Sequence, residues 1–160
     1  MLRIANFAQN HDCSTFDCGV LPLNEYLQRH AMQNQRASAV QTYVALIDTV
    51  LVGYYSLVVG EIAHQQAPER MKKGLARHPV PVMVLARLAV DLKWKGKGIG
   101  SGLLKDATKK TVSASQIAGV RALVVHAKDE GARNFYLRHG FHEGFPNPLH
   151  LYALTKELSL

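Results

Sequence analysis

The chain has 160 residues, of which 48% are apolar and 19% are charged, the mixture of a globular protein with a sizeable core. This composition excludes a disordered tail or a fibrous repeat, and the length favours one domain over residues 1–160. The net charge of +7 favours an acidic partner, such as nucleic acid or a phosphate-bearing cofactor. A basic surface that serves only solubility is the alternative.

The sequence predicts a reduced, cytoplasmic protein without a membrane-spanning helix. Asp48 and Arg87 interrupt the two most apolar segments before either reaches the roughly 18 residues that a span needs. The first eleven residues lack the long apolar stretch of a secretory signal. Cys13 and Cys18 match neither a C-x-x-C nor a zinc pattern and are too few for a disulfide framework, so we expect no metal site.

The first half of the chain predicts a helix, a hairpin and a basic loop. Apolar residues recur at helical spacing towards the end of residues 12–36, which indicates a loop followed by a helix. Residues 40–47 and 50–59 are β-branched and aromatic, and the polar pair Asp48-Thr49 between them indicates a hairpin. Residues 65–78 are polar and basic, and we expect a surface loop with about one helical turn.

The second half alternates strands and helices. A nearly continuous apolar run predicts a central strand buried on both faces, and a glycine-rich turn then opens a long helix. Such strand–helix–strand units predict an α/β fold with a mixed sheet and helices on both faces. The expected elements are a strand at 82–90, the turn at 95–102, a helix to about 117, a strand at 121–127, a helix at 130–139 and a strand at 149–154.

The glycine-rich turn is the strongest chemical signal in the sequence. Glycines at 96, 98 and 100 let a ligand approach the backbone closely, and N–H groups at a helix start attract a pyrophosphate. The alternative is a plain tight turn with solvated lysines. The turn does not match a Walker A loop, because Gly98 follows Lys97, and Leu103 stands where the dinucleotide fingerprint requires a third glycine. ATP and NAD are therefore disfavoured.

Three segments together resemble the GNAT superfamily of N-acetyltransferases: residues 84–91, 95–100 and 132–141. The family's pyrophosphate motif is Arg or Gln, two residues, Gly, one residue, then Gly or Ala. Here it reads Lys95, Gly98 and Gly100, so lysine replaces the leading residue and lacks its planar donor group. Residues 16–19 and 23–27 further resemble the acetyltransferase toxins of bacterial toxin–antitoxin pairs, which acetylate aminoacyl-tRNA and stop translation.

The resemblance implies a GNAT fold, in which the strand at 82–90 splays from its neighbour, and acetyl-CoA as the cofactor. Main-chain groups around the end of this strand would align pantetheine, and the turn would hold the pyrophosphate. Asn134 could bond the pantetheine or only cap a loop. The cofactor-binding residues implied are Leu88, Ala89, Val90, Lys95, Gly96, Lys97, Gly98, Ile99, Gly100, Ser101 and Asn134.

The same resemblance makes Tyr136 the catalytic candidate. A phenol with a pKa near 10 can protonate a departing thiolate, whose own reference pKa is about 8.5. The alternative is a core tyrosine of an amphipathic helix. We assign no general base, because an α-amine titrates near 7.7–8.0 and an esterified amino acid is more acidic still.

Basic residues on the first helix and in the 65–78 loop are candidates for tRNA binding, namely Arg29, Arg36, Lys72, Lys73 and Arg77. Such residues neutralise phosphates without reading bases, so binding should weaken steeply with salt. A solvated charged face is the alternative. The partners that the resemblance implies are aminoacyl-tRNA, a second copy of the chain and a ribbon–helix–helix antitoxin.

Two other functions remain open at this stage. An acetyltransferase acting on a small-molecule or protein amine would share every cofactor residue, so the turn does not discriminate it. A non-catalytic nucleic-acid-binding module would use the same positive charge but would not bind acetyl-CoA.

Overall fold

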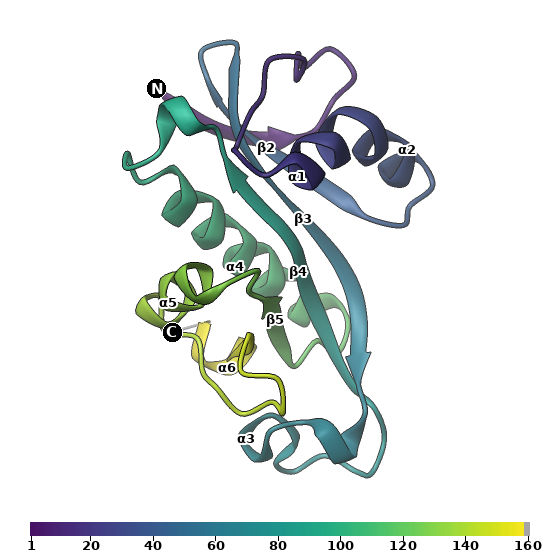
Figure 1. The fold of residues 1–160 in the computed structure, drawn as a ribbon. Coiled ribbons are helices and arrows are strands. Elements are labelled where there is room, and N and C mark those ends of the chain that lie inside the picture. The colour runs from purple at the N-terminus through teal and green to yellow at the C-terminus, as the bar shows by residue number, and fades with distance from the viewer. Residues whose placement is uncertain (159–160) are drawn as a thin grey trace. The chain divides into compact units, whose positions relative to one another are not determined.

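A computed structural model describes residues 1–158. Six strands are interspersed with helices and short turns (Figure 1). In chain order the elements are β1 (Leu2–Asn6), α1 (Leu21–Glu25), the π-helical turn η1 (Tyr26–His30), α2 (Ala31–Arg36), β2 (Gln41–Ile47), β3 (Val50–Ile62), η2 (His64–Gln66), α3 (Glu69–Lys72), β4 (Val80–Val90), η3 (Leu92–Trp94), α4 (Ile99–Ile117), β5 (Ala122–His126), α5 (Glu130–Arg138), β6 (His150–Leu154) and α6 (Thr155–Leu158).

The strands form one mixed sheet in the order β1-β2-β3-β4-β5-β6, so the predicted α/β class is confirmed. The pairs β1–β2, β2–β3 and β5–β6 are antiparallel, and β4–β5 is parallel. The β4–β5 register joins residues 83–85 to residues 123–125, whereas β4 continues to Val90. The main chain of residues 86–90 therefore lies beyond that register, as a splayed strand requires.

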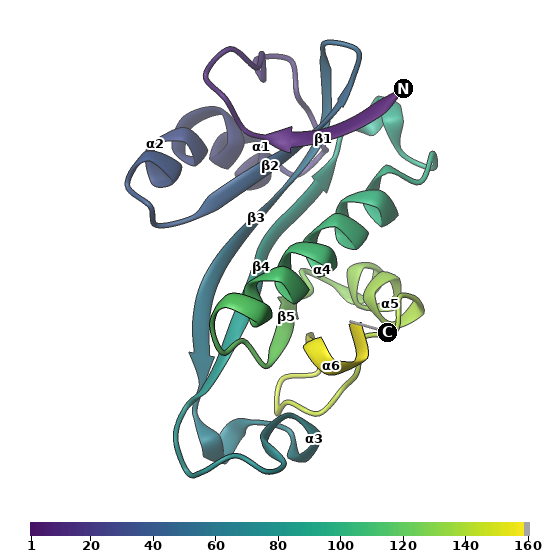
Figure 2. The same ribbon diagram turned by 180° about the vertical axis from the view of Figure 1, so that it is seen from behind.

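The chain divides into two compact units. Unit 1 comprises Met1–Val58 and Ala86–Ala107, and unit 2 comprises Val59–Leu85 and Thr108–Leu160. In unit 1, β1 lies along β2 at the edge of the sheet (Figure 2). The pieces β1–β3, α1, η1 and α2 of this unit enclose one apolar core, to which Ala89 of β4 also belongs.

The unit 1 core forms around Tyr54. The Phe16 ring meets the Tyr54 ring edge-on at 5.7 Å, and Leu27 is 1% exposed in the same cluster. On β3, a side chain at Gly53 would lie 3.0 Å from both the Ala89 carbonyl oxygen and Leu103 of α4. Glycine is therefore required at this position for β3, β4 and α4 to pack closely.

Unit 2 has its own core beneath the basic loop. Met71 of α3 is fully buried against residues of β4, β5 and β6. The Arg121 guanidinium donates to the carbonyl oxygens of Met71 and Lys73 at 2.8 and 2.6 Å. These bonds satisfy carbonyls at the end of a very short helix and fix the middle of the 65–78 loop.

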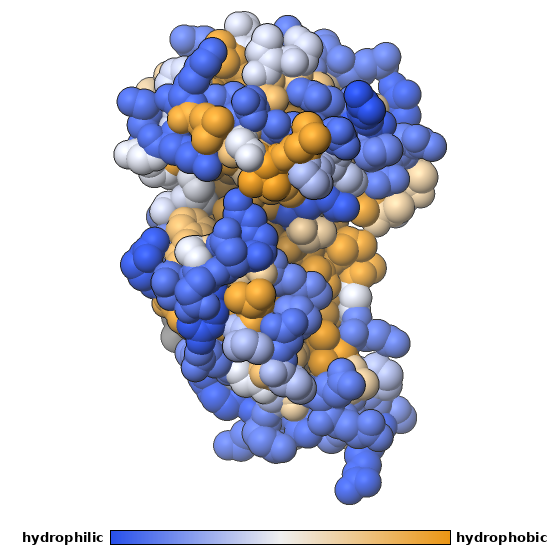
Figure 3. All heavy atoms as spheres, viewed as in Figure 1, coloured by the Kyte–Doolittle hydropathy of each residue, from blue (hydrophilic) through white to orange (hydrophobic). Residues whose placement is uncertain are grey.

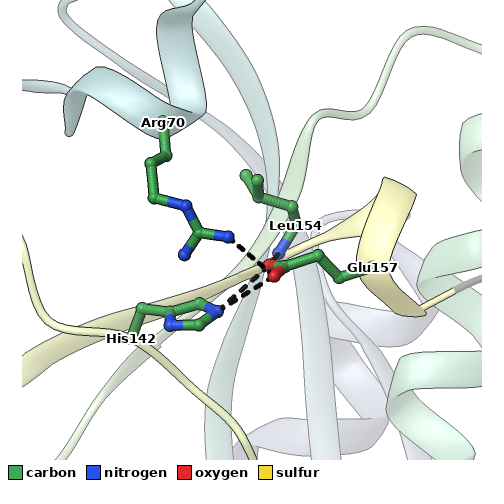
Figure 4. A network of polar contacts seen from close by, with 4 residues as sticks. All are labelled: Arg70, His142, Leu154 and Glu157. Atoms are coloured by element: carbon green, nitrogen blue, oxygen red, sulfur yellow. Dashed lines mark hydrogen bonds and ion pairs between the residues drawn. The ribbon is translucent and has the colours of Figure 1, made fainter.

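A polar network joins α3 to α6 (Figure 4). The carboxylate of Glu157 accepts from Arg70 at 2.8 Å, lies 3.1 Å from His142 Nε2 and accepts from the Leu154 N–H at 3.4 Å. Partial burial raises the pKa of Glu157, but the Arg70 hydrogen bond and the neighbouring His142 outweigh it, so the pKa is lowered. The network ties the basic loop to the end of the described chain.

Two sequence expectations need correction. The strand at 82–90 is not buried on both faces, because Ala86 is exposed and both Arg87 and Leu88 are half-buried. Because the β4–β5 ladder covers only residues 83–85, the later part of β4 is not enclosed as a central strand would be. The sequence analysis also missed β1 and α6. Across residues 1–158, no helix combines the length and the apolar character needed to cross a membrane.

Candidate active site

The glycine-rich turn lies in unit 1, between the end of β4 and the start of α4. Gly96 and Gly98 have φ angles of +78° and +80°, a backbone conformation that side chains other than glycine rarely adopt. A side chain built at either position would meet nothing within 4 Å. The turn therefore presents bare backbone to open space, as close approach by a ligand requires.

The start of α4 adds backbone donors to this turn. Ile99 is the first residue of a helix of 19 residues, and the Gly102 N–H bonds back to the Gly98 carbonyl at 3.0 Å. The first N–H groups of such a helix have no intrahelical acceptor and carry partial positive charge. Lys95 and Lys97 are exposed beside them. The predicted residues from Leu88 to Ser101 thus form one continuous segment of unit 1 that suits an anionic group.

A polar network fixes the point where this turn begins. The buried carboxylate of Asp91 accepts from the N–H groups of Asp17 and Lys93 at 3.1 and 2.9 Å. The Asp17 carboxylate in turn accepts from Asn24 and from the Gly19 N–H, both at 2.9 Å, and these bonds lower its pKa. Two segments that carry the toxin-like motifs, 74 positions apart, are therefore bonded to each other at the end of β4.

Tyr136 lies on α5 in unit 2. The Asp129 carboxylate caps this helix by accepting from the Ala132 N–H at 2.8 Å. The Tyr136 ring packs against Phe135 and Phe141 and is 7% exposed, and burial raises its pKa to about 12. Within residues 1–158, no group hydrogen bonds to its hydroxyl. The phenol therefore keeps its proton at neutral pH and has no internal acceptor for it.

Asn134 is exposed on the same helix. Two residues of an α-helix differ by about 200° around its axis, so Asn134 and Tyr136 face different sides. Its role at pantetheine stays a prediction. On the neighbouring strands of unit 2, the rings of His126 and His150 stack at 3.9 Å, and burial followed by the His150 charge lowers the pKa of His126.

The candidate RNA-binding residues occur in both units. Arg29 on η1 and Arg36 on α2 are exposed in unit 1, and Lys73 and Arg77 are exposed in unit 2. Lys72 is less available, because its ammonium donates to the His64 carbonyl at 3.1 Å and lies 3.4 Å from the Glu69 carboxylate.

The end of unit 2 that carries α3 has a mainly hydrophilic surface (Figure 3). A cavity of about 510 Å³ opens there, and its lining combines Ala63, Gln65 and Pro79 with the basic or titratable side chains of His64, Lys72, Arg77 and His78. This surface has the charge that a polyanion requires.

Sequence reasoning assigned no role to one arginine of β4. The Arg87 guanidinium carbon lies 3.4 Å from the centroid of the Tyr26 ring, at the start of the π-helical turn. Arg87 stands inside the family-like segment 84–91, which was the available signal, but spacing alone does not reveal its aromatic partner.

Comparison with known proteins identifies the family. Residues 38–143 match the model described as an acetyltransferase (GNAT) domain. The chain belongs to the GNAT acetyltransferase family. It is 40% identical over 146 residues to a tRNA-acetylating toxin of Mycobacterium tuberculosis (strain ATCC 25618 / H37Rv), a match that covers 91% of this chain and 87% of that protein.

Solved GNAT toxins share its fold. AtaT in complex with acetyl-methionyl-tRNAfMet is 28% identical, with a TM-score of 0.92 over 99% of this chain and 98% of that one. A mutant AtaT toxin bound to acetyl-CoA and the C-terminus of the antitoxin AtaR is 28% identical, with a TM-score of 0.84 over 99% and 96% of the two chains. The resemblance drawn from the sequence motifs is confirmed.

Proposed function

We propose that this GNAT acetyltransferase uses acetyl-CoA to acetylate the α-amino group of aminoacyl-tRNA and acts as a translation-blocking toxin. One observation carries the proposal: the turn after β4 holds Gly96 and Gly98 at positive φ, with open space above both. A turn of this kind at a helix start is suited to a diphosphate. The similarity to a tRNA-acetylating toxin supports the choice of acceptor.

The chain's own residues fit acetyl-CoA, which supplies the acetyl group as an activated thioester. N–H groups of residues 95–101 would bind the diphosphate, with the side chains of Lys95 and Lys97 adding positive charge. Main-chain groups of residues 88–90, beyond the β4–β5 register, would align the pantetheine. Tyr136, protonated and without an internal acceptor, would donate its proton to the departing thiolate.

The acceptor amine needs no strong base. Free α-amines titrate near 7.7–8.0, and esterification lowers that value, so a large neutral fraction exists at pH 7. The chain's task is then to position the amine and exclude competing reactions.

The basic residues of η1, α2 and the 65–78 loop would bind the tRNA backbone: Arg29, Arg36, Lys72, Lys73 and Arg77. Reversing the charge of the exposed residues Lys73 and Arg77 should weaken tRNA binding and reduce its salt dependence by about one phosphate contact per residue, while acetyl-CoA binding is unchanged. Reversing Lys109 and Lys110 of α4 is the charge-matched control. Equal effects of the two pairs would contradict the assignment.

The remaining parts of the proposal follow from the family resemblance. We propose that a second copy of the chain completes a homodimer, and that a ribbon–helix–helix antitoxin neutralises the toxin. The site of action would be the cytoplasm, where charged tRNA is translated. Both units would form one catalytic domain, because β3, β4 and α4 each continue from one unit into the other.

A direct assay tests the function. The purified chain is given labelled acetyl-CoA with aminoacyl-tRNA, deacylated tRNA, free amino acids or a basic protein, and label in each acceptor is counted. We expect label only in aminoacyl-tRNA. Label in the free amino acids or the protein would favour the small-molecule or protein alternative. No thermal stabilisation by acetyl-CoA, where about 2.7 kcal/mol is expected at a hundredfold excess over Kd, would favour a non-catalytic module.

A further inference from the structure

In unit 1, the guanidinium of Arg87 stacks on the ring of Tyr26, and the surrounding core holds that ring in place. The guanidinium carbon stands 3.4 Å from the ring centroid, so the planar cation lies against the ring face. The ring itself is fixed, because Tyr26 is 6% exposed in the core and its hydroxyl accepts from Asn34 at 3.1 Å. The arginine is therefore held in one orientation before any ligand arrives.

The held guanidinium has unused donors. Across residues 1–158, the Arg87 side chain makes no hydrogen bond and no ion pair, and its guanidinium stacks on the aromatic face of Tyr26. An arginine carries five N–H donors in a plane, and stacking leaves those at the edge of the plane free. Arg87 is half-buried, so its charge is only partly hydrated. A flat, unpaired and oriented guanidinium is suited to bidentate binding of a phosphate.

The turn beneath the arginine is unusual. Tyr26 begins the π-helical turn η1, which continues to His30, and turns of this width occur frequently at functional sites. The same turn ends in two basic residues, Arg29 and His30. No described carboxylate neutralises Arg87.

The position of Arg87 along β4 indicates which phosphate it meets. The proposed diphosphate site lies beyond the C-terminal end of β4, so the pantetheine would run back along residues 88–90 and its thioester would lie near Arg87. The acceptor amine must reach the same point. In aminoacyl-tRNA, the phosphodiester of the last nucleotide is one ribose away from the aminoacyl ester.

We propose that Arg87, stacked on Tyr26, binds the phosphodiester of the 3′-terminal nucleotide of the acceptor and thereby positions the aminoacyl amine. This inference rests on the proposed function. Arg87 is a positioning residue, since it contacts the substrate away from the reacting atoms. It explains how the enzyme would distinguish an aminoacyl group on RNA from a free amino acid, which has no such phosphate.

Two minimal acceptors test this assignment. Both carry an aminoacyl group amide-linked to the 3′ position of adenosine, and only one carries a 5′-phosphate, in the place of the phosphodiester. For the unchanged protein we expect kcat/KM to be about 10- to 100-fold higher with the phosphorylated acceptor, the size of a hydrogen bond to a charged group. In Arg87→Gln this preference should disappear, while kcat/KM for the unphosphorylated acceptor and the Kd for acetyl-CoA stay the same.

The controls separate a phosphate contact from a loss of folding. Arg3→Gln removes one exposed arginine of unit 1 and should keep the full phosphate preference. Arg87→Lys keeps the charge but lacks the planar donors, so it should keep only part of the phosphate preference. If Arg87→Gln does not fold, as judged from its thermal transition, Tyr26→Leu replaces it, because loss of the ring frees the guanidinium and should also reduce the preference.

The outcomes distinguish this inference from the proposed function. If the unchanged protein acetylates aminoacyl-tRNA and both small acceptors but shows no phosphate preference, the assignment of Arg87 is wrong and the function stands. Retention of the preference in folded Arg87→Gln, or equal losses on both acceptors, also overturns it. If aminoacyl-tRNA is not acetylated at all, the proposed function itself fails.

Discussion

The two regions that carry the candidate site residues, one in each unit, are built in opposite ways. In unit 1, the turn at Gly96 and Gly98 presents backbone to open space, and a side chain added at either glycine would meet nothing within 4 Å. In unit 2, Tyr136 is enclosed by aromatic rings, and its one functional atom is a hydroxyl. A site made of main-chain groups tolerates side-chain changes but not a changed backbone conformation. A site made of one side chain depends on a single oxygen.

Removing that oxygen should have the largest effect. Tyr136→Phe is expected to lower acetyl transfer by about 10²–10⁴-fold, the range of general acid catalysis. Acetyl-CoA affinity and the free energy of unfolding should be nearly unchanged, because the hydroxyl has no hydrogen-bond partner within residues 1–158. Single-turnover rates, isothermal titration with acetyl-CoA and a denaturant titration measure these three quantities.

Tyr54→Phe is the matched control for this variant. The Tyr54 hydroxyl is buried and donates to the Leu23 carbonyl at 2.7 Å, so its loss should cost about 0.5–1.5 kcal/mol of stability and leave transfer intact. Full turnover by Tyr136→Phe would remove this residue from the mechanism and break the contrast between the two regions.

The second largest effect is expected from a substitution in the glycine-rich turn, and it should appear in the affinity for acetyl-CoA. Gly98→Ala places a side chain in the open space above the backbone, where the diphosphate must approach, and should raise the Kd for acetyl-CoA by roughly 10–100-fold. The positive φ should also cost about 1–2 kcal/mol of stability. Isothermal titration and thermal unfolding separate the two effects.

Gly74 offers an unusually close control for Gly98. It has the same φ of +80° and also has nothing within 4 Å of an added side chain, but it lies in the basic loop of unit 2. Gly74→Ala should therefore lose similar stability without weakening acetyl-CoA binding. Equal losses of affinity in the two variants would mean that strain, and not the ligand, explains the result.

The pH dependence of acetyl transfer tests whether Tyr136 acts as a buried acid. Burial raises the pKa of Tyr136 to about 12, so the acid stays protonated well above neutral pH. Transfer should rise as the acceptor amine loses its proton near pH 8 and then stay level to about pH 10.5. The amide-linked acceptor permits this measurement, because it survives alkaline pH. A decline with an apparent pKa near 10 would indicate an exposed phenol in place of the buried one.

The sequence predicted most elements of this fold because their patterns are local. Hydrophobic periodicity, together with glycines that mark turns and helix ends, predicts three parts of the fold. These are the hairpin of β2 and β3, the helix after the glycine-rich turn and the strand–helix–strand segment at the end. The edge strand β1 was missed, since Leu2–Asn6 is short and largely exposed and has no clear alternation. The burial of β4 was overestimated, because its composition does not show where the neighbouring ladder ends.

The site was predictable to the same extent. Glycine spacing located the turn, because the requirement for positive φ is carried by the residue type itself. The bond between Asp17 and Asp91 and the stacking of Arg87 on Tyr26 were not predictable, since each joins distant parts of the chain. The π-helical turn was not predicted for a related reason. Its width is set by tertiary packing, and the spacing of apolar residues is compatible with both an α-helix and a π-helix.

The smallest expected effect concerns Lys95, the position at which the turn departs from the family motif. Its side chain is exposed, so its attraction to a diphosphate is screened by water and salt and should contribute no more than about 1 kcal/mol. Lys95→Ala should then raise the Kd for acetyl-CoA only about two- to fivefold, and the difference should shrink at high salt. Lys95→Arg restores the planar donors and should bind at least as well as the unchanged chain. A loss above tenfold in Lys95→Ala would mean that a side chain, and not the bare backbone, dominates binding at this turn, and the contrast with Tyr136 would no longer hold.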